Sequence, residues 1–101
     1  DQVAILPISE NYNEYAQNVL ELLKNYDIRG FVDDRNEKIG KKIRESELNK
    51  IPFMLVVGEK ESENQTISVR QRLDGDKGSL TVEAFAELVM NTIEVELTTN
   101  A

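Results

Sequence analysis

A short apolar run, Phe53–Val57, constrains the fold of this chain more than any other feature. Pro52 precedes the run, Gly58 follows it, and none of its residues is polar. A strand at a solvent-exposed edge would present polar side chains on one side, and this run has none. It therefore predicts a buried strand in a largely parallel sheet, because such strands are covered on both faces and are apolar throughout.

Apolar spacing predicts further strands and helices on both sides of this run. Alternation with a period of two indicates a strand, and apolar residues three and four positions apart indicate a helix. We expect strands over residues 3–8, 29–33, 66–70 and 79–80, helices over 13–26, 37–49 and 82–97, a polar turn over 59–65, a loop over 73–78 and a polar tail over 98–101. The last helix, capped by Thr81, is expected to bury Val82, Phe85, Ala86, Val89, Ile93 and Leu97. The result is a small α/β sandwich with a mixed sheet, whose strand over 66–70 runs antiparallel to the buried one.

The composition is that of one soluble globular domain. With 101 residues, 40% of them hydrophobic and 31% charged, the chain matches a single domain spanning 1–101. It begins with Asp1, and the first predicted strand starts at Val3, so we expect a domain cut from a longer protein. No apolar stretch approaches the roughly 18 residues of a membrane span, and we expect no signal peptide. We therefore expect a cytoplasmic location and no membrane contact.

The absence of cysteine and histidine narrows the chemistry that the chain can perform. Without cysteine there are no disulfides or thiolate metal sites, which fits a reducing cytosolic compartment. Without histidine, the usual general base and the usual metal ligand are both missing. The phosphate-binding patterns GxGxxG and GxxxxGK[ST] are absent as well, so nucleotide-cofactor binding has no support. We expect no catalytic residue, metal or cofactor in this chain.

Positive charge is concentrated in residues 35–50 of an otherwise acidic chain. This window holds six lysine or arginine residues and three glutamates, a net charge of +3, whereas the whole chain carries −7. The acidic residues Asp33, Asp34 and Glu37 could suggest a hard-cation site, but basic residues lie among them and a helix-capping turn is the commoner interpretation. Gly40 lies early in the expected helix, where glycine costs up to about 1 kcal/mol relative to alanine. It is either a tolerated exposed glycine or a point of close backbone approach.

Several hydrogen-bonding side chains are expected near the carboxyl ends of the parallel strands, where open α/β sheets bind ligands. They are Asn36, Arg44, Glu61 and Arg70. Asparagine, arginine and glutamate side chains can recognise the edges of nucleic-acid bases. Phosphates would be attracted by Lys38, Lys41 and Lys42. The alternative, which composition alone favours, is a solvated charged helix whose surface salt bridges contribute about 0–1 kcal/mol each.

The segment DDRNEKIGKKIRESELNKIPFMLVVGEKE, followed by ISVRQR, closely resembles the carboxy-terminal anticodon-binding domain of threonyl-tRNA synthetases, which are class IIa aminoacyl-tRNA synthetases. The block NEKIG-x-KIRE is the specific part, and the similarity extends over essentially the whole chain. It implies a three-layer α/β/α sandwich with a five-stranded, mostly parallel mixed sheet and three helices. It also implies that the last two anticodon bases, G then U, bind at Asn36, Lys38, Arg44, Glu61 and Arg70. Possible phosphate contacts are Arg35, Lys41, Lys42 and Arg72.

The resemblance also implies a larger parent protein in which this domain is not catalytic. The parent would be a homodimeric threonine–tRNA ligase that uses ATP, Mg²⁺ and Zn²⁺ in its catalytic domain. The isolated domain would be a monomer, with the anticodon stem-loop of tRNA(Thr) and that catalytic domain, but no DNA, as partners. Two alternatives remain open. One is an accessory or protein-interaction module of the same fold, and the other is a small-molecule α/β enzyme, for which almost no candidate base exists.

Overall fold

The computed structural model describes the backbone of residues 2–100 and the side chains of residues 2–91. Its elements, in chain order, are β1 (Val3–Pro7), η1 (Glu10–Tyr12), α1 (Asn13–Lys24), β2 (Gly30–Val32), α2 (Ile39–Leu48), β3 (Phe53–Val57), α3 (Glu59–Asn64), β4 (Ile67–Gln71), β5 (Gly75–Leu80) and α4 (Val82–Asn100). No helix in this described part is long and apolar enough to cross a membrane.

The strands form one mixed sheet in the order β2-β1-β3-β4-β5. The pairs β1–β2 and β1–β3 are parallel, and the pairs β3–β4 and β4–β5 are antiparallel, so only β4 runs against the other four strands. The apolar run is β3, in the middle of this order, where Leu55 pairs with Ile5 on one side and Val69 on the other. The predicted buried strand and its antiparallel neighbour are confirmed.

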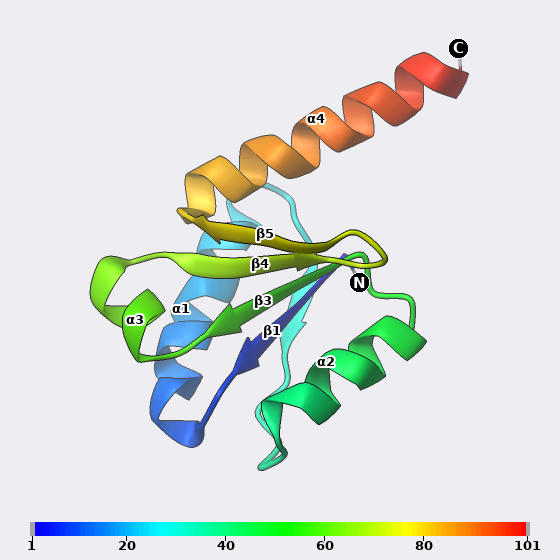
Figure 1. Cartoon of the computed structure of the whole chain (residues 1–101). Coiled ribbons are helices and arrows are strands. Elements are labelled where there is room, and N and C mark those ends of the chain that lie inside the picture. Colours follow the sequence, from blue (N-terminus) through cyan, green and yellow to red (C-terminus); the bar gives the residue numbers. More distant parts are fainter. Residues whose placement is uncertain (1, 101) are drawn as a thin grey trace.

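Helices cover both faces of the sheet, as the three-layer prediction requires (Figure 1). On one face, α1 and the first half of α4 pack over a core that includes Leu23, Leu55, Val69 and Phe85. On the other face, the isoleucines of α2 and its flanks pack against a smaller cluster of buried residues, Ala4, Leu6 and Met54. The α2 side of the sheet is thus the less fully covered side.

The last helix begins where the sequence predicted. The hydroxyl oxygen of Thr81 accepts a hydrogen bond from the Ala84 N–H at 3.1 Å, which satisfies one of the free donors in the first turn. The expected apolar face is confirmed for Val82, Phe85, Ala86 and Val89, all of which are buried. Ile93 and Leu97 lie outside the described side chains. The helix runs to Asn100, so the expected polar tail from residue 98 is wrong up to that residue, and Ala101 lies outside the described residues.

Two other expectations are wrong. The polar turn over 59–65 is the helix α3, which makes four α-helices instead of three between residues 2 and 100. Its capping box was present in the sequence, because Glu61 accepts a hydrogen bond from the backbone N–H of Gly58 at 2.8 Å. The loop over 73–78 is largely strand, since β5 starts at Gly75. Its polar, glycine-containing sequence has no apolar alternation, so only pairing with β4 reveals it.

Candidate nucleic-acid interface

The β4 and β5 end of the sheet has a polar surface on its α2 side. Along β4, Ile67 and Val69 face the core beneath α1 and α4, so Ser68 and Arg70 face the opposite side. Their partners on β5 are Ser79 and Asp76. Figure 1 shows α2 by β1 and β3, away from β4 and β5, in agreement with its packing on Ala4, Leu6 and Met54. Within the described part of the chain, Asp76 and Ser79 of this strip are exposed, and Ser68 and Arg70 are half-buried.

Arg70 has an unusual position on this strip. It pairs with Met54 of β3, and its Nε atom is buried without a hydrogen-bond partner among the described residues. A buried donor that lacks an acceptor costs about 1–3 kcal/mol. Arg70 as a whole is half-buried, so an acceptor from outside the domain can approach its side chain, although not the buried Nε itself.

One flank of α2 borders the same strip. The buried side of α2 holds Ile39, Lys42, Ile43 and Ser46. Residues on one neighbouring flank, among them Glu45 and Asn49, line a hollow against β2. At 100° per residue, Gly40, Arg44 and Glu47 lie on the other flank, toward β4. The Nε atom of Arg72, which follows β4, donates to the Glu47 carbonyl at 3.0 Å and confirms this orientation. We call the polar strip and this flank together (Gly40, Arg44, Ser68, Arg70, Asp76 and Ser79) the open face.

Gly40 leaves a gap on the open face. A Cβ atom at this position would meet no described atom within 4 Å. The close backbone approach that glycine can permit is therefore not used inside the domain. The space is available to an external group, and Arg44 is exposed one helical turn further along α2.

Asn36 and Lys38 lie in the exposed loop between β2 and α2. Asp33 shapes this loop by accepting hydrogen bonds from Nε and Nη2 of Arg35 at 2.8 and 2.9 Å. Those bonds hold the pKa of the Asp33 carboxyl below its ordinary value, although its burial opposes the shift. Arg35 also donates to Glu45 of α2. The hard-cation alternative is weakened, because both carboxylate oxygens of Asp33 are engaged by Arg35.

Glu61 lies apart from Arg70. It belongs to α3, beyond the carboxyl end of β3, where one carboxylate oxygen caps the helix by accepting from Gly58. Burial and, secondarily, the charge of Glu61 raise the pKa of Tyr15, so this carboxylate lies near α1. Arg70 pairs with Met54, three residues before the end of β3 or about 10 Å along the strand. The Arg70 and Glu61 side chains can therefore meet at one base only if Arg70 extends along the sheet toward α3.

Lys42 is not available as a phosphate contact. It is only 2% exposed, and its Nζ atom donates to the carbonyl oxygens of Pro7 and Asp33. The sequence contained the signal, because Lys42 shares the buried stripe of α2 with Ile39, Ile43 and Ser46. Its charge was mistaken for a solvent-facing one.

The other expected phosphate contacts differ in how free they are. Lys41 is exposed and forms an ion pair with Glu37 at 3.3 Å. Arg35 is held by two carboxylates, and Arg72 is bonded to the Glu47 carbonyl. An RNA phosphate would have to compete with these interactions.

Comparison with known proteins gives this geometry a family. A family model described as the anticodon binding domain matches residues 2–92. The chain belongs to this family. This anticodon-binding domain is 56% identical over 94 residues to the threonine–tRNA ligase of Bacteroides thetaiotaomicron, a match that covers 93% of the chain and 15% of that protein. It is 57% identical over 97 residues to the same-named protein of Phocaeicola vulgatus, covering 92% and 15%.

A solved structure supports the same relationship. The anticodon-binding domain superposes with a TM-score of 0.83 and 32% identity on the crystal structure of the RNA binding domain of threonyl-tRNA synthetase from Cryptosporidium parvum. The match covers 89% of this chain and 23% of that one. The resemblance found in the sequence is confirmed. The domain spans about 15% of the length of the curated relatives that it matches.

Proposed function

We propose that this domain recognises the anticodon loop of a threonine tRNA on behalf of a threonine–tRNA ligase. The observation that carries the proposal is Arg70, whose buried Nε has no acceptor and which lies on an uncovered polar sheet surface. Unpaired loop bases offer their edges to such donors, whereas a duplex hides them. The family match and the names of the relatives support the same class of ligand.

The two bases would be recognised by different parts of the domain. Arg70 would donate a bidentate pair to O6 and N7 of guanine. Glu61 would accept from guanine N1–H and N2–H₂ with the carboxylate oxygen that does not cap α3. Asn36, which has both an amide donor and an amide acceptor, would pair with uracil, and Arg44 on the open face would assist. Lys38 and Lys41 would contribute the phosphate attraction.

The net charge of −7 is compatible with RNA binding, because the charges are segregated. Exposed cations lie on α2 and the loop before it, and exposed carboxylates lie on α1 and α4, for example Glu21 and Glu87. An approaching phosphate backbone is attracted on the α2 side and repelled elsewhere. The charge distribution therefore favours a single docking orientation.

An NMR titration with an anticodon stem-loop that ends in GU, beside one in which the G is replaced by A, tests the proposal. For wild type, we expect shifts at Asn36, Lys38, Arg44, Glu61 and Arg70 and a preference for the GU loop. Arg70→Ala should abolish that preference, a loss of about 5- to 150-fold if one bidentate pair contributes about 1–3 kcal/mol.

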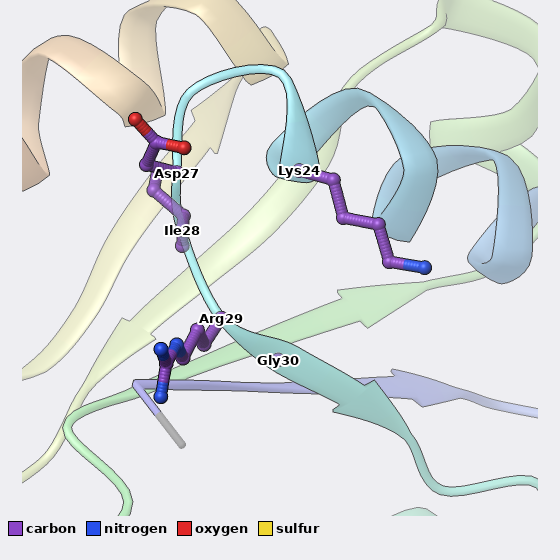
Figure 2. A pocket seen from close by; sticks show the side chains of 5 residues that line it. All are labelled: Lys24, Asp27, Ile28, Arg29 and Gly30. Carbon is purple, nitrogen blue, oxygen red and sulfur yellow. The ribbon is translucent and has the colours of Figure 1, made fainter.

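Arg29→Ala is the matched control. Arg29 is also exposed, but it lines a pocket at the start of β2, across β1 and β3 from β4 (Figure 2). The preference for G should survive in this variant. If Arg70→Ala weakens all loops equally, the assignment of Arg70 to guanine is wrong. If wild type does not distinguish the loops, the domain is an interaction module of the same fold.

The proposal extends to the protein of which this domain would be a part. We propose that the larger protein attaches threonine to its tRNA in the cytoplasm, as a homodimer. The domain itself would be a non-catalytic monomer. ATP, Mg²⁺ and Zn²⁺ would act in the catalytic region, with none of them held by the residues described above.

A further inference from the structure

We infer that Lys42 is a positioning residue, whose buried ammonium group holds the loop from Asp33 to Lys38 in the shape that presents Asn36 to RNA. This inference rests on the proposed function. Lys42 itself touches no base or phosphate in this account. It acts through the loop.

The ammonium group bridges two strands at the point where they separate. Parallel pairing between β1 and β2 ends at Ile5 and Val32, with one more bond from the Asp33 N–H to the Ile5 carbonyl at 2.9 Å. Beyond that point, Lys42 Nζ donates to the Pro7 carbonyl at 3.1 Å and to the Asp33 carbonyl at 2.9 Å. One side chain of α2 thereby fixes the last residue of β1 and the first residue of the loop.

The same loop is tied to α2 a second time. Arg35 donates to Asp33 and to Glu45, which lies one turn below Lys42 on the helix. The Lys38 carbonyl at the end of the loop accepts from the N–H of Lys42 itself at 3.1 Å. Asn36 therefore lies between two anchors that both depend on α2. Of these two anchors, only the Lys42 anchor is shielded from water and salt.

Burying an ammonium group at this position needs an explanation beyond packing. The neighbouring cluster is apolar, with Ile39 and Ile43 against Ala4, Leu6 and Met54, and an apolar side chain would suit it at least as well. Both hydrogen bonds of Lys42 Nζ are to backbone carbonyl oxygens and neither is to a carboxylate. What an apolar residue could not do is satisfy both carbonyls where the strands diverge. The retained charge serves the geometry of the loop.

This role predicts a split between the two bases. Asn36 lies on the loop that Lys42 anchors, whereas Arg70 lies on β4, two strands away from β1 in the sheet. Loss of the Lys42 anchor should impair recognition of U without affecting recognition of G. A residue needed only for folding would impair both together.

The test compares Lys42→Met with Lys41→Met, the adjacent exposed lysine. Methionine keeps the length and the helix propensity of lysine but donates no hydrogen bond. Affinities are measured for three stem-loops: the GU loop, one with the U replaced by C, and one with the G replaced by A. In Lys42→Met, we expect the U-over-C preference to fall by at least about fivefold, within the range of one base contact, with the G-over-A preference unchanged. Lys41→Met should weaken all three loops to the same extent.

Two results would overturn the inference. One is a folded Lys42→Met that keeps its preference for U, and the other is an equal loss of both preferences. If Lys42→Met does not fold, Lys42→Gln, which keeps donors on a shorter side chain, is measured with the same three loops. Wild type without either preference would refute the proposed function instead. In that case, ¹⁵N relaxation of residues 34–37 is compared between free wild type and free Lys42→Met. Unchanged relaxation in the variant would show that Lys42 does not anchor the loop.

Discussion

Gly40→Ala should make the domain more stable and, at the same time, a poorer RNA binder. Gly40 is the second residue of α2, and a Cβ at this position meets no described atom within 4 Å. Alanine therefore brings its better helix propensity without a clash inside the domain. Because Gly40 lies on the flank with Arg44, the added methyl group would project into the open face, where we propose that RNA binds.

The magnitude follows from the position in the helix. Alanine exceeds glycine by about 1 kcal/mol in a helix interior, and the gain is smaller near an end, so about 0.5–1 kcal/mol is expected. For a domain of this size, that gain raises Tm by about 2–8 °C. Filling a gap that a ligand uses costs about 1 kcal/mol or more, so affinity for the GU stem-loop should fall at least about fivefold.

Thermal unfolding and stem-loop titration of the same samples measure the two effects. Gly30→Ala is the opposite control, because its Cβ would lie 2.9 Å from the Val3 carbonyl oxygen of the adjacent strand (Figure 2 shows the position of Gly30). That backbone contact cannot yield without moving β2, so this variant should lose about 1–3 kcal/mol. Its distance from the open face should leave base preference intact.

Two outcomes would refute the reasoning. A Gly40→Ala domain that is less stable than wild type would mean that the gap at Gly40 is filled in solution. A variant that is more stable but binds RNA as tightly as wild type would show that RNA does not occupy the flank of α2 toward β4. The orientation of the open face would then be wrong, whatever the role of Arg70.

Three further predictions concern stability. Leu73→Gly should stabilise the domain by about 0.5–1 kcal/mol in thermal unfolding, because Leu73 is 85% exposed and adopts a φ of +71° in the hairpin turn, which only glycine adopts without strain; Leu73→Ala, which keeps the strain, should not. Asp33→Asn should destabilise the domain at pH 7. Because Arg35 lowers the folded-state pKa of Asp33, this stabilisation is complete above the ordinary value of about 3.9 and is lost as pH falls through the lower folded value. Urea unfolding of wild type and Asp33→Asn should therefore give free energies of unfolding that differ at pH 7 and become more similar at pH 2. An equal difference at both pH values would contradict this reasoning. Phe85→Ala should cost about 3–5 kcal/mol, since Phe85 is fully buried and packs edge-to-face on Phe53 with ring centroids 5.3 Å apart; a fall in Tm of less than about 12 °C would be inconsistent with that burial.

Much of the fold could be predicted because its signals are local. The apolar run at Phe53–Val57 identified the buried strand, and helical spacing identified α1, α2 and the face of α4. The helix α3 was missed although its signal, a glutamate three residues after Gly58, is equally local. The strand β5 was missed because its signal is not local. Its exposed, glycine-containing sequence becomes a strand only because β4 offers backbone hydrogen-bonding groups beside it.

For the candidate site too, some properties depend on local sequence and others on tertiary contacts. By itself, the sequence determined the family, the charged helix and the residue types that can recognise bases, since these depend only on the order of residues. The tertiary structure decided which of these side chains are free. Burial is set by neighbours that are distant in the chain. The carbonyls of Pro7 and Asp33 hold Lys42 inside the domain, whereas no described acceptor satisfies the buried Nε of Arg70. Two similar basic residues thus have opposite roles, because one found its hydrogen-bond partners within the fold and the other remains available to a ligand.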